Sequence, residues 1–159
     1  MKKNMKVFLK IVMLFVVFSL QYINVKAAPA CCTANCKLGS CSINSTATSC
    51  ACMCLPNGNP SCAGDKSKSI SANPTQMGNI EAVILFYYSL ESDAGDAAAM
   101  YMEEIQTLFI DNDGFLEEDS DAVEAYEIAS NAISTIIAQD FSPTEQSELE
   151  SLLDGMEEE

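Results

Sequence analysis

Eight cysteines lie within residues 31–62 of this chain, and none lies outside that segment. Apart from cysteine, the segment contains only four large apolar residues, which are Leu38, Ile43, Met53 and Leu55. A segment this short rarely folds on hydrophobic burial alone and normally needs disulfides, a metal ion or oligomerisation. Cross-links between the cysteines must therefore provide most of its stability.

The cysteine pattern favours disulfides. An even number of cysteines in an exported chain is typical of a disulfide framework, and four bridges of about 2–4 kcal/mol each would be sufficient. The paired Cys-x-x-Cys spacing of many zinc sites is absent. The sequence leaves the connectivity open, although a strained bridge between the two adjacent cysteines is disfavoured. The candidate half-cystines are Cys31, Cys32, Cys36, Cys41, Cys50, Cys52, Cys54 and Cys62.

Metal binding by the same cysteines is the alternative hypothesis. Cys50, Cys52 and Cys54 occupy alternate positions, so an extended strand would point all three side chains to one face. Three thiolates on one face can share a soft ion such as Zn²⁺ or Cu⁺. Nothing in the sequence requires a cofactor. A bound metal ion is the only cofactor that the cysteine pattern leaves possible.

The cysteine-rich segment also contains two short loop motifs. The sequence PNGNP at residues 56–60 predicts a tight turn that brings Cys62 back beside the strand at residues 50–54. Asn44-Ser45-Thr46 fits the acceptor pattern for N-glycosylation, so Asn44 is a candidate modification site.

Residues 1–27 have the organisation of a secretory signal peptide. Three lysines occur among the first six residues, the stretch 11–20 is apolar except for Ser19, and small residues Val25 and Ala27 precede a cleavage point. The apolar stretch is too short for a membrane span, and no later segment qualifies. We therefore expect a secreted or periplasmic protein without a transmembrane span. Lipidation of Cys31 after an alternative cleavage stays open.

The charge distribution limits the partners of the mature chain. Five of the eight lysines belong to the predicted leader, so three lysines remain against 23 acidic residues, a formal charge of −20. Residues 69–159 contain no lysine or arginine. A protein that binds nucleic acids or anionic membranes needs a basic surface, so both are excluded as partners of this chain. An unidentified protein or another basic surface is the expected partner, and the oligomeric state is open.

The residue types that are missing argue against an enzyme. The chain contains no histidine and no arginine. Without histidine there is no imidazole base or His-activated nucleophile, and without arginine there is no bidentate clamp for phosphate or carboxylate. The sequence therefore favours a non-catalytic binding protein, with metal binding as the alternative.

Composition divides the chain into four parts: the leader 1–27, a cysteine-rich module 28–62, a polar linker 63–76 and an acidic helical bundle 77–159. We expect a small cystine-rich module, irregular or β, followed by an all-α bundle of about four helices. The predicted helices cover residues 79–90, 94–110 and 121–138, with a fourth starting after Ser142. The first of these is apolar on every side, and a buried strand is its alternative.

Within the helices, apolar spacing and capping residues predict the details. Tyr126, Ala129, Ile133 and Ile137 recur at three- and four-residue steps and should face the core. Ser142, Pro143 and Glu145 form a capping box. We expect three methionines of this half, Met100, Met102 and Met156, to fill gaps in the core.

The loop at residues 111–116 resembles the middle of an EF-hand calcium loop. With Gly114 at the sixth position, however, the first position is Phe109 and the twelfth is Ser120, so the first carboxylate and the bidentate glutamate are missing. A plain connection between helices is favoured. A weak Ca²⁺ site is the alternative, with candidate ligands Asp111, Asp113, Glu117 and Asp119.

Overall fold

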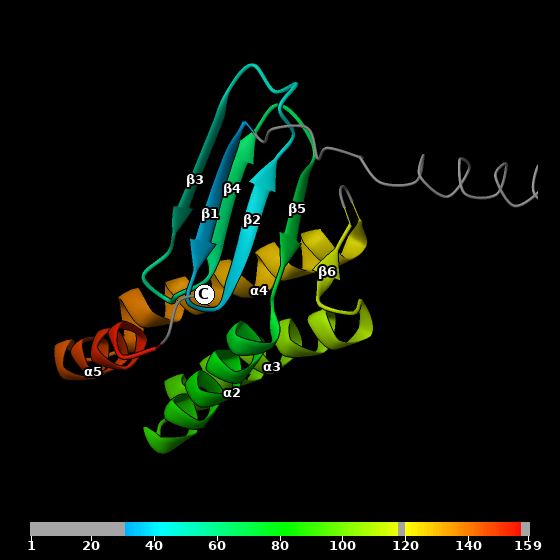
Figure 1. Ribbon diagram of the computed structural model, residues 1–159. Helices are drawn as coiled ribbons and strands as arrows, with labels where there is room; N and C mark the ends of the chain where they lie inside the picture. Colours follow the sequence, from blue (N-terminus) through cyan, green and yellow to red (C-terminus); the bar gives the residue numbers. More distant parts are fainter. Residues whose placement is uncertain (1–30, 118–119, 157–159) are drawn as a thin grey trace, which may run out of the picture.

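The computed structural model describes residues 31–117 and 120–156, and the predicted leader 1–27 lies outside them. Within these ranges a cysteine-rich β region precedes four helices, which confirms the predicted fold class (Figure 1). The strands are β1 (Cys32–Cys36), β2 (Gly39–Ile43), β3 (Cys50–Cys54), β4 (Pro60–Gly64), β5 (Lys68–Ser71) and β6 (Phe115–Leu116). The helices are α2 (Pro74–Ser89), α3 (Asp93–Asp111), α4 (Asp121–Asp140) and α5 (Pro143–Asp154).

The strands form two antiparallel sheets that pack against each other. Strands β1, β2, β5 and β6 make one sheet in that order, and the β3–β4 hairpin makes the second. Side chains alternate between the two faces of a strand, so Cys36, Cys41 and Ile70 of the first sheet are buried while Thr33 and Asn35 on its other face are exposed. The cysteines therefore lie between the two sheets.

The segment 63–76, expected to be a polar linker, contains the whole of β5. This strand pairs with β2 on one side, where Ile70 lies opposite Cys41, and with β6 on the other, where Ile70 lies opposite Leu116. Ile70 is the single large apolar residue of the segment, and it is buried. One apolar residue among serines is a weak local signal, because the partner strands that bury it come from distant parts of the chain.

Each helix begins at a capping side chain. Asn73 caps α2 and forms a reciprocal pair with Gln76, with Pro74 at the first helical position. The sequence places the start of this helix at residue 79, five residues too late, although these N-terminal signals were present. The helix resolves the choice between helix and strand for residues 80–90. Ser142 and Glu145 form the predicted capping box of α5.

The predicted core positions of the helices are mostly correct. Tyr126, Ala129, Ile133 and Ile137 are all buried, as the spacing in α4 predicts. Met102 is fully buried, but Met100 is 57% exposed, so its predicted place in the core is wrong. Two residues along a helix differ by about 200° in direction, which puts Met100 on the outer face of α3.

The helices lie beneath the β1–β2 and β3–β4 turns, and both parts share one apolar core (Figure 1). Leu38, in the β1–β2 turn, is completely buried. In the β3–β4 turn, Asn57 donates from Nδ2 to the Ser130 carbonyl of α4 at 3.1 Å. Gln76 of α2 donates to the Cys36 carbonyl at 2.9 Å. The strand turns therefore form part of the surface on which the helices pack.

Helices long and apolar enough to span a membrane do not occur in residues 31–117 and 120–156.

Candidate functional site

All eight cysteines lie at bonding distance from another cysteine. Five pairs of sulfurs are in contact, involving Cys52 and Cys62 twice each. A sulfur forms only one disulfide, so the Cys52–Cys62 contact cannot coexist with bridges from both residues to other partners. Only the set without that contact pairs every cysteine: Cys31 with Cys50, Cys32 with Cys52, Cys36 with Cys54, and Cys41 with Cys62.

The four bridges join one sheet to the other. Their Cα–Cα distances are 6.3, 5.9, 5.5 and 6.1 Å, all within the usual range for disulfides. The three alternating cysteines of β3 pair in order with those in and just before β1, and the fourth bridge joins β2 to β4. The predicted single-faced orientation of Cys50, Cys52 and Cys54 is therefore confirmed, as is the absence of a vicinal bridge.

Three of these sulfurs form the tightest group of possible metal ligands in the described residues. The Sγ atoms of Cys32, Cys52 and Cys62 all lie within 4.8 Å of one another. Cys52 and Cys62 are direct cross-strand partners in the β3–β4 hairpin, with a Cα–Cα distance of 4.2 Å. As thiolates they could share one soft ion. As half-cystines they could not, because the thiolate is the metal ligand.

The acidic loop at residues 111–117 acts as a connection between α3 and β6. Asp113 and Gly114 both have positive φ angles, 53° and 79°, and form a tight turn. The Gly114 amide donates to the Phe109 carbonyl at 2.7 Å, and its carbonyl accepts from the Ala72 amide at 2.9 Å. This turn places Phe115 and the buried Leu116 beside β5.

The structure does not gather the candidate calcium ligands. Asp111, Asp113 and Glu117 are exposed. They belong to no group of three ligand atoms within 4.8 Å in the described part of the chain. Asp119 lies outside the described residues. The Ca²⁺ site stays a prediction from the sequence.

Asn44 lies in the exposed turn after β2. Its Oδ1 accepts hydrogen bonds from the backbone amide and the hydroxyl of Thr46, at 3.0 and 3.1 Å. The side chain thereby bridges the first and third residues of the acceptor triplet. Glycosylation at this position stays a prediction.

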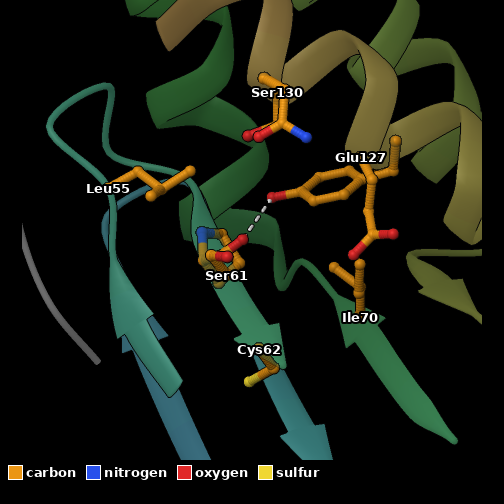
Figure 2. A pocket seen from close by; sticks show the side chains of 9 residues that line it. Leu55, Ser61, Cys62, Ile70, Glu127 and Ser130 are labelled. Carbon is orange, nitrogen blue, oxygen red and sulfur yellow. Dashed lines mark hydrogen bonds between the residues drawn. The ribbon is translucent and has the colours of Figure 1, made fainter. Parts of the chain in front are cut away.

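A small cavity separates β4 from α4 (Figure 2). The Tyr126 hydroxyl, whose pKa is raised by burial, donates to the Pro60 carbonyl at 3.3 Å. Glu127, at the edge of the cavity, is paired with Lys68. The volume of about 30 Å³ is enough for about one water molecule and far below that of typical small-molecule sites.

Two further cavities lie at the surface. One, of about 230 Å³, separates the strand turns from α5 and includes Lys37, Pro56 and Glu150. The other, of about 270 Å³, is a mainly apolar groove between the start of α2 and the end of α3, lined by Pro74 and Ile110 among others. Both are open hollows and smaller than the sites that enclose a drug-sized ligand.

The structure also reveals an exposed apolar face on α2 and α3 that the sequence patterns did not identify. Leu85 and Tyr88 of α2 and Met100 and Ile110 of α3 are all exposed. The signal in the sequence was only the three-residue spacing of Leu85 and Tyr88, because Glu81, one turn before Leu85, interrupts the same face of α2. It was hidden because α2 is apolar on nearly every side.

No protein family matches this chain, and no curated protein or solved structure is significantly similar to it.

Proposed function

We propose that this chain is a secreted, non-catalytic protein that acts by binding a basic partner protein. The observation that carries the proposal is the set of four bridges between the two sheets, which gives a short segment the rigidity of a recognition scaffold. The helices attached to it are rich in carboxylates and contain no basic residue. A negative surface of this kind attracts a basic partner over a Debye length of about 8–10 Å at physiological salt.

Export is supported by two independent features. Paired cysteines persist in oxidising compartments, and the leader pattern at residues 1–27 matches a secretory signal. The bridge of Cys31 to Cys50 also argues against a lipoprotein, because the bridged sulfur has no thiol left to take a lipid.

The proposal of a non-catalytic role rests on side-chain chemistry. The chain has no imidazole to move a proton near neutral pH and no guanidinium to orient an anion. Tyr87 and Tyr126 are buried, and burial raises the pKa of both hydroxyls, so they stay protonated and are poor proton donors near neutral pH. Binding through an exposed surface uses what the chain does have.

Metal binding is the second candidate function, favoured by the proximity of the Cys32, Cys52 and Cys62 sulfurs. A soft ion such as Zn²⁺ or Cu⁺ would fit three thiolates at this separation. This function requires that the corresponding bridges be reduced, whereas the binding function requires that they be formed.

Intact mass spectrometry of the exported protein, recorded without reductant, separates the two functions. Four disulfides lower the denatured mass by about 8 Da relative to the all-thiol chain, and the same spectrum locates the leader cleavage. We expect this oxidised mass and no retained metal in the native spectrum. The full thiol mass with a metal adduct would instead establish the metal-binding function. A mass that retains residues 1–27 would contradict export.

A further inference from the structure

Exposed apolar side chains gather on one face of the helices. Seven large apolar side chains are exposed in the described residues, and four of them belong to α2 and α3. Leu85 is 64% exposed, Tyr88 44%, Met100 57% and Ile110 62%. We call these four residues, with the apolar groove at Pro74 and Ile110, the α2–α3 face.

The two helices are antiparallel, which places these residues in two neighbouring rows. The Tyr88 hydroxyl donates to Glu103 Oε1 at 2.9 Å, so the end of α2 lies against the middle of α3. Met100 comes one turn before Glu103 on α3 and therefore lies next to Tyr88. At the other end, Pro74 of α2 and Ile110 of α3 line the same groove of about 270 Å³.

Carboxylates lie in the same two rows as the exposed apolar residues. Glu81 lies one turn before Leu85 on α2, and Asp96 and Glu103 lie one turn on either side of Met100 on α3. All three side chains are exposed. The last basic residue of the chain is Lys68, which is paired with Glu127 on α4. Carboxylates and apolar residues therefore alternate along each helix, and the α2–α3 face is a mixed apolar and negative surface.

We propose that the α2–α3 face binds a basic amphipathic helix of the partner protein, with apolar residues of that helix seated between α2 and α3. The inference rests on the proposed binding function and assigns it a surface. From Pro74 to Tyr88 the face extends about 21 Å along α2, the length of about four helical turns. Apolar anchors spaced by three or four residues would meet the exposed apolar side chains, and lysines or arginines beside these anchors would meet the carboxylates.

The charge pattern selects this occupant over the alternatives. A second copy of the chain would bring two negative faces together, and like charges in contact oppose association. An anionic lipid surface is repelled for the same reason. A basic amphipathic helix matches both the exposed apolar residues and the carboxylates between them.

The proposal is tested with the mature chain and an 18-residue peptide of leucine and lysine at helical spacing, labelled with fluorescein. Fluorescence anisotropy gives the dissociation constant at low and physiological salt. The double variant Leu85→Ser with Met100→Ser should bind the peptide about tenfold more weakly, because two apolar contacts are lost. The matched control is Met53→Ser with Ile128→Ser, at residues 58% and 60% exposed on β3 and α4, and we expect a change of less than about twofold.

A charge variant tests the carboxylates of the same face. Replacing Glu81 and Glu103 by glutamine keeps the side-chain size, and the amide oxygen introduced at position 103 can still accept the Tyr88 hydrogen bond. We expect weaker binding at low salt and a shallower dependence on salt concentration. Circular dichroism melts of all variants establish that each is folded.

The outcomes separate this inference from the proposed function. Equal weakening by the Leu85/Met100 pair and by the Met53/Ile128 pair, or no weakening by either, overturns the α2–α3 face while attraction to a basic partner stands. Absence of peptide binding to the unmodified chain at low salt overturns both. A dimer of the mature chain that the Leu85/Met100 substitutions dissolve would identify a second copy as the occupant and overturn the basic helix.

Discussion

At the scale of single residues, the buried turn between β3 and β4 is the most demanding part of the structure. Gly58 has a φ angle of +82°, which L-residues with a side chain rarely adopt. A Cβ atom at this position would lie 2.8 Å from Leu153 Cδ2 on α5 and 3.0 Å from Leu38 Cγ. The neighbouring Asn57 is fully buried and anchors the turn to α4 through the Ser130 carbonyl and the Ser134 hydroxyl. The requirement for glycine is thus both conformational and steric.

Replacing Gly58 by alanine should lower the free energy of unfolding by about 2 kcal/mol or more, from the left-handed conformation and the close contacts together. Gly78 provides the control, because it lies on the exposed side of α2 and a Cβ atom added there would meet nothing within 4 Å. Alanine there should stabilise the protein by about 0.5–1 kcal/mol. Urea unfolding measures both, and equal effects of the two substitutions would contradict this account of the turn.

At the scale of elements, a capping side chain fixes the first residue of each helix. Ser92, Ser120 and Ser142 cap α3, α4 and α5, as Asn73 caps α2. Each cap satisfies an amide that the helix itself leaves unpaired. In α5 the cap is reciprocal, since the Ser142 amide donates to Glu145 Oε2 at 2.6 Å and Ser142 Oγ accepts from the Glu145 amide at 3.3 Å. These short-range contacts explain why the helices could be located from the sequence.

The capping box of α5 should make stability depend on pH. Hydrogen bonds from Ser142 lower the pKa of Glu145 below its ordinary value of 4.5. A carboxyl with a lower pKa in the folded state stabilises the fold above the unfolded pKa, and that contribution disappears as the pH falls through the folded pKa. Glu145→Gln should therefore destabilise the protein at pH 7 and have a smaller effect at pH 3. Urea midpoints of both proteins at the two pH values test this, and an unchanged difference would contradict it.

At the scale of the whole molecule, the disulfide-linked sheets and the helices form one packed structure. Leu38 from the strand turns and Leu153 from α5 belong to the same buried cluster. Hydrogen bonds from Gln76 and Asn79 of α2 to the carbonyls of Cys36 and Lys37 join the two parts as well. A shared core of this kind predicts cooperative unfolding.

Removing the disulfide farthest from the helices tests that cooperativity. Strands β1 and β3 both begin at their ends away from the helices (Figure 1). Cys50 is the first residue of β3, and Cys31 directly precedes β1. Replacing both with serine releases a loop of 19 residues, which should lower the free energy of unfolding by about 3 kcal/mol. In one cooperative unit, the helical signal at 222 nm loses stability by that same amount. A helical transition unchanged by the substitution would show that the helices fold independently of the sheets.

The sequence by itself determined the features that depend on near neighbours. The cysteine count and the lack of apolar residues predicted a small cystine-rich module, irregular or β, and helical spacing with capping residues predicted about four helices. The turn at Asn57-Gly58 was also predicted, since positive φ is a local property of the backbone. Of the candidate sites, the sequence identified every cysteine but no pairing.

The tertiary structure decided everything that depends on contacts between distant segments. Ile70 became part of a central strand because β2 and β6 flank it, and Met100 became exposed because Ala98 and Met102 occupy the inner face of α3. The disulfide pairing followed from the stacking of the two sheets, and the α2–α3 face followed from which side of an apolar helix the rest of the chain covers. Periodicity and capping act within a few residues, whereas burial is set by the whole fold.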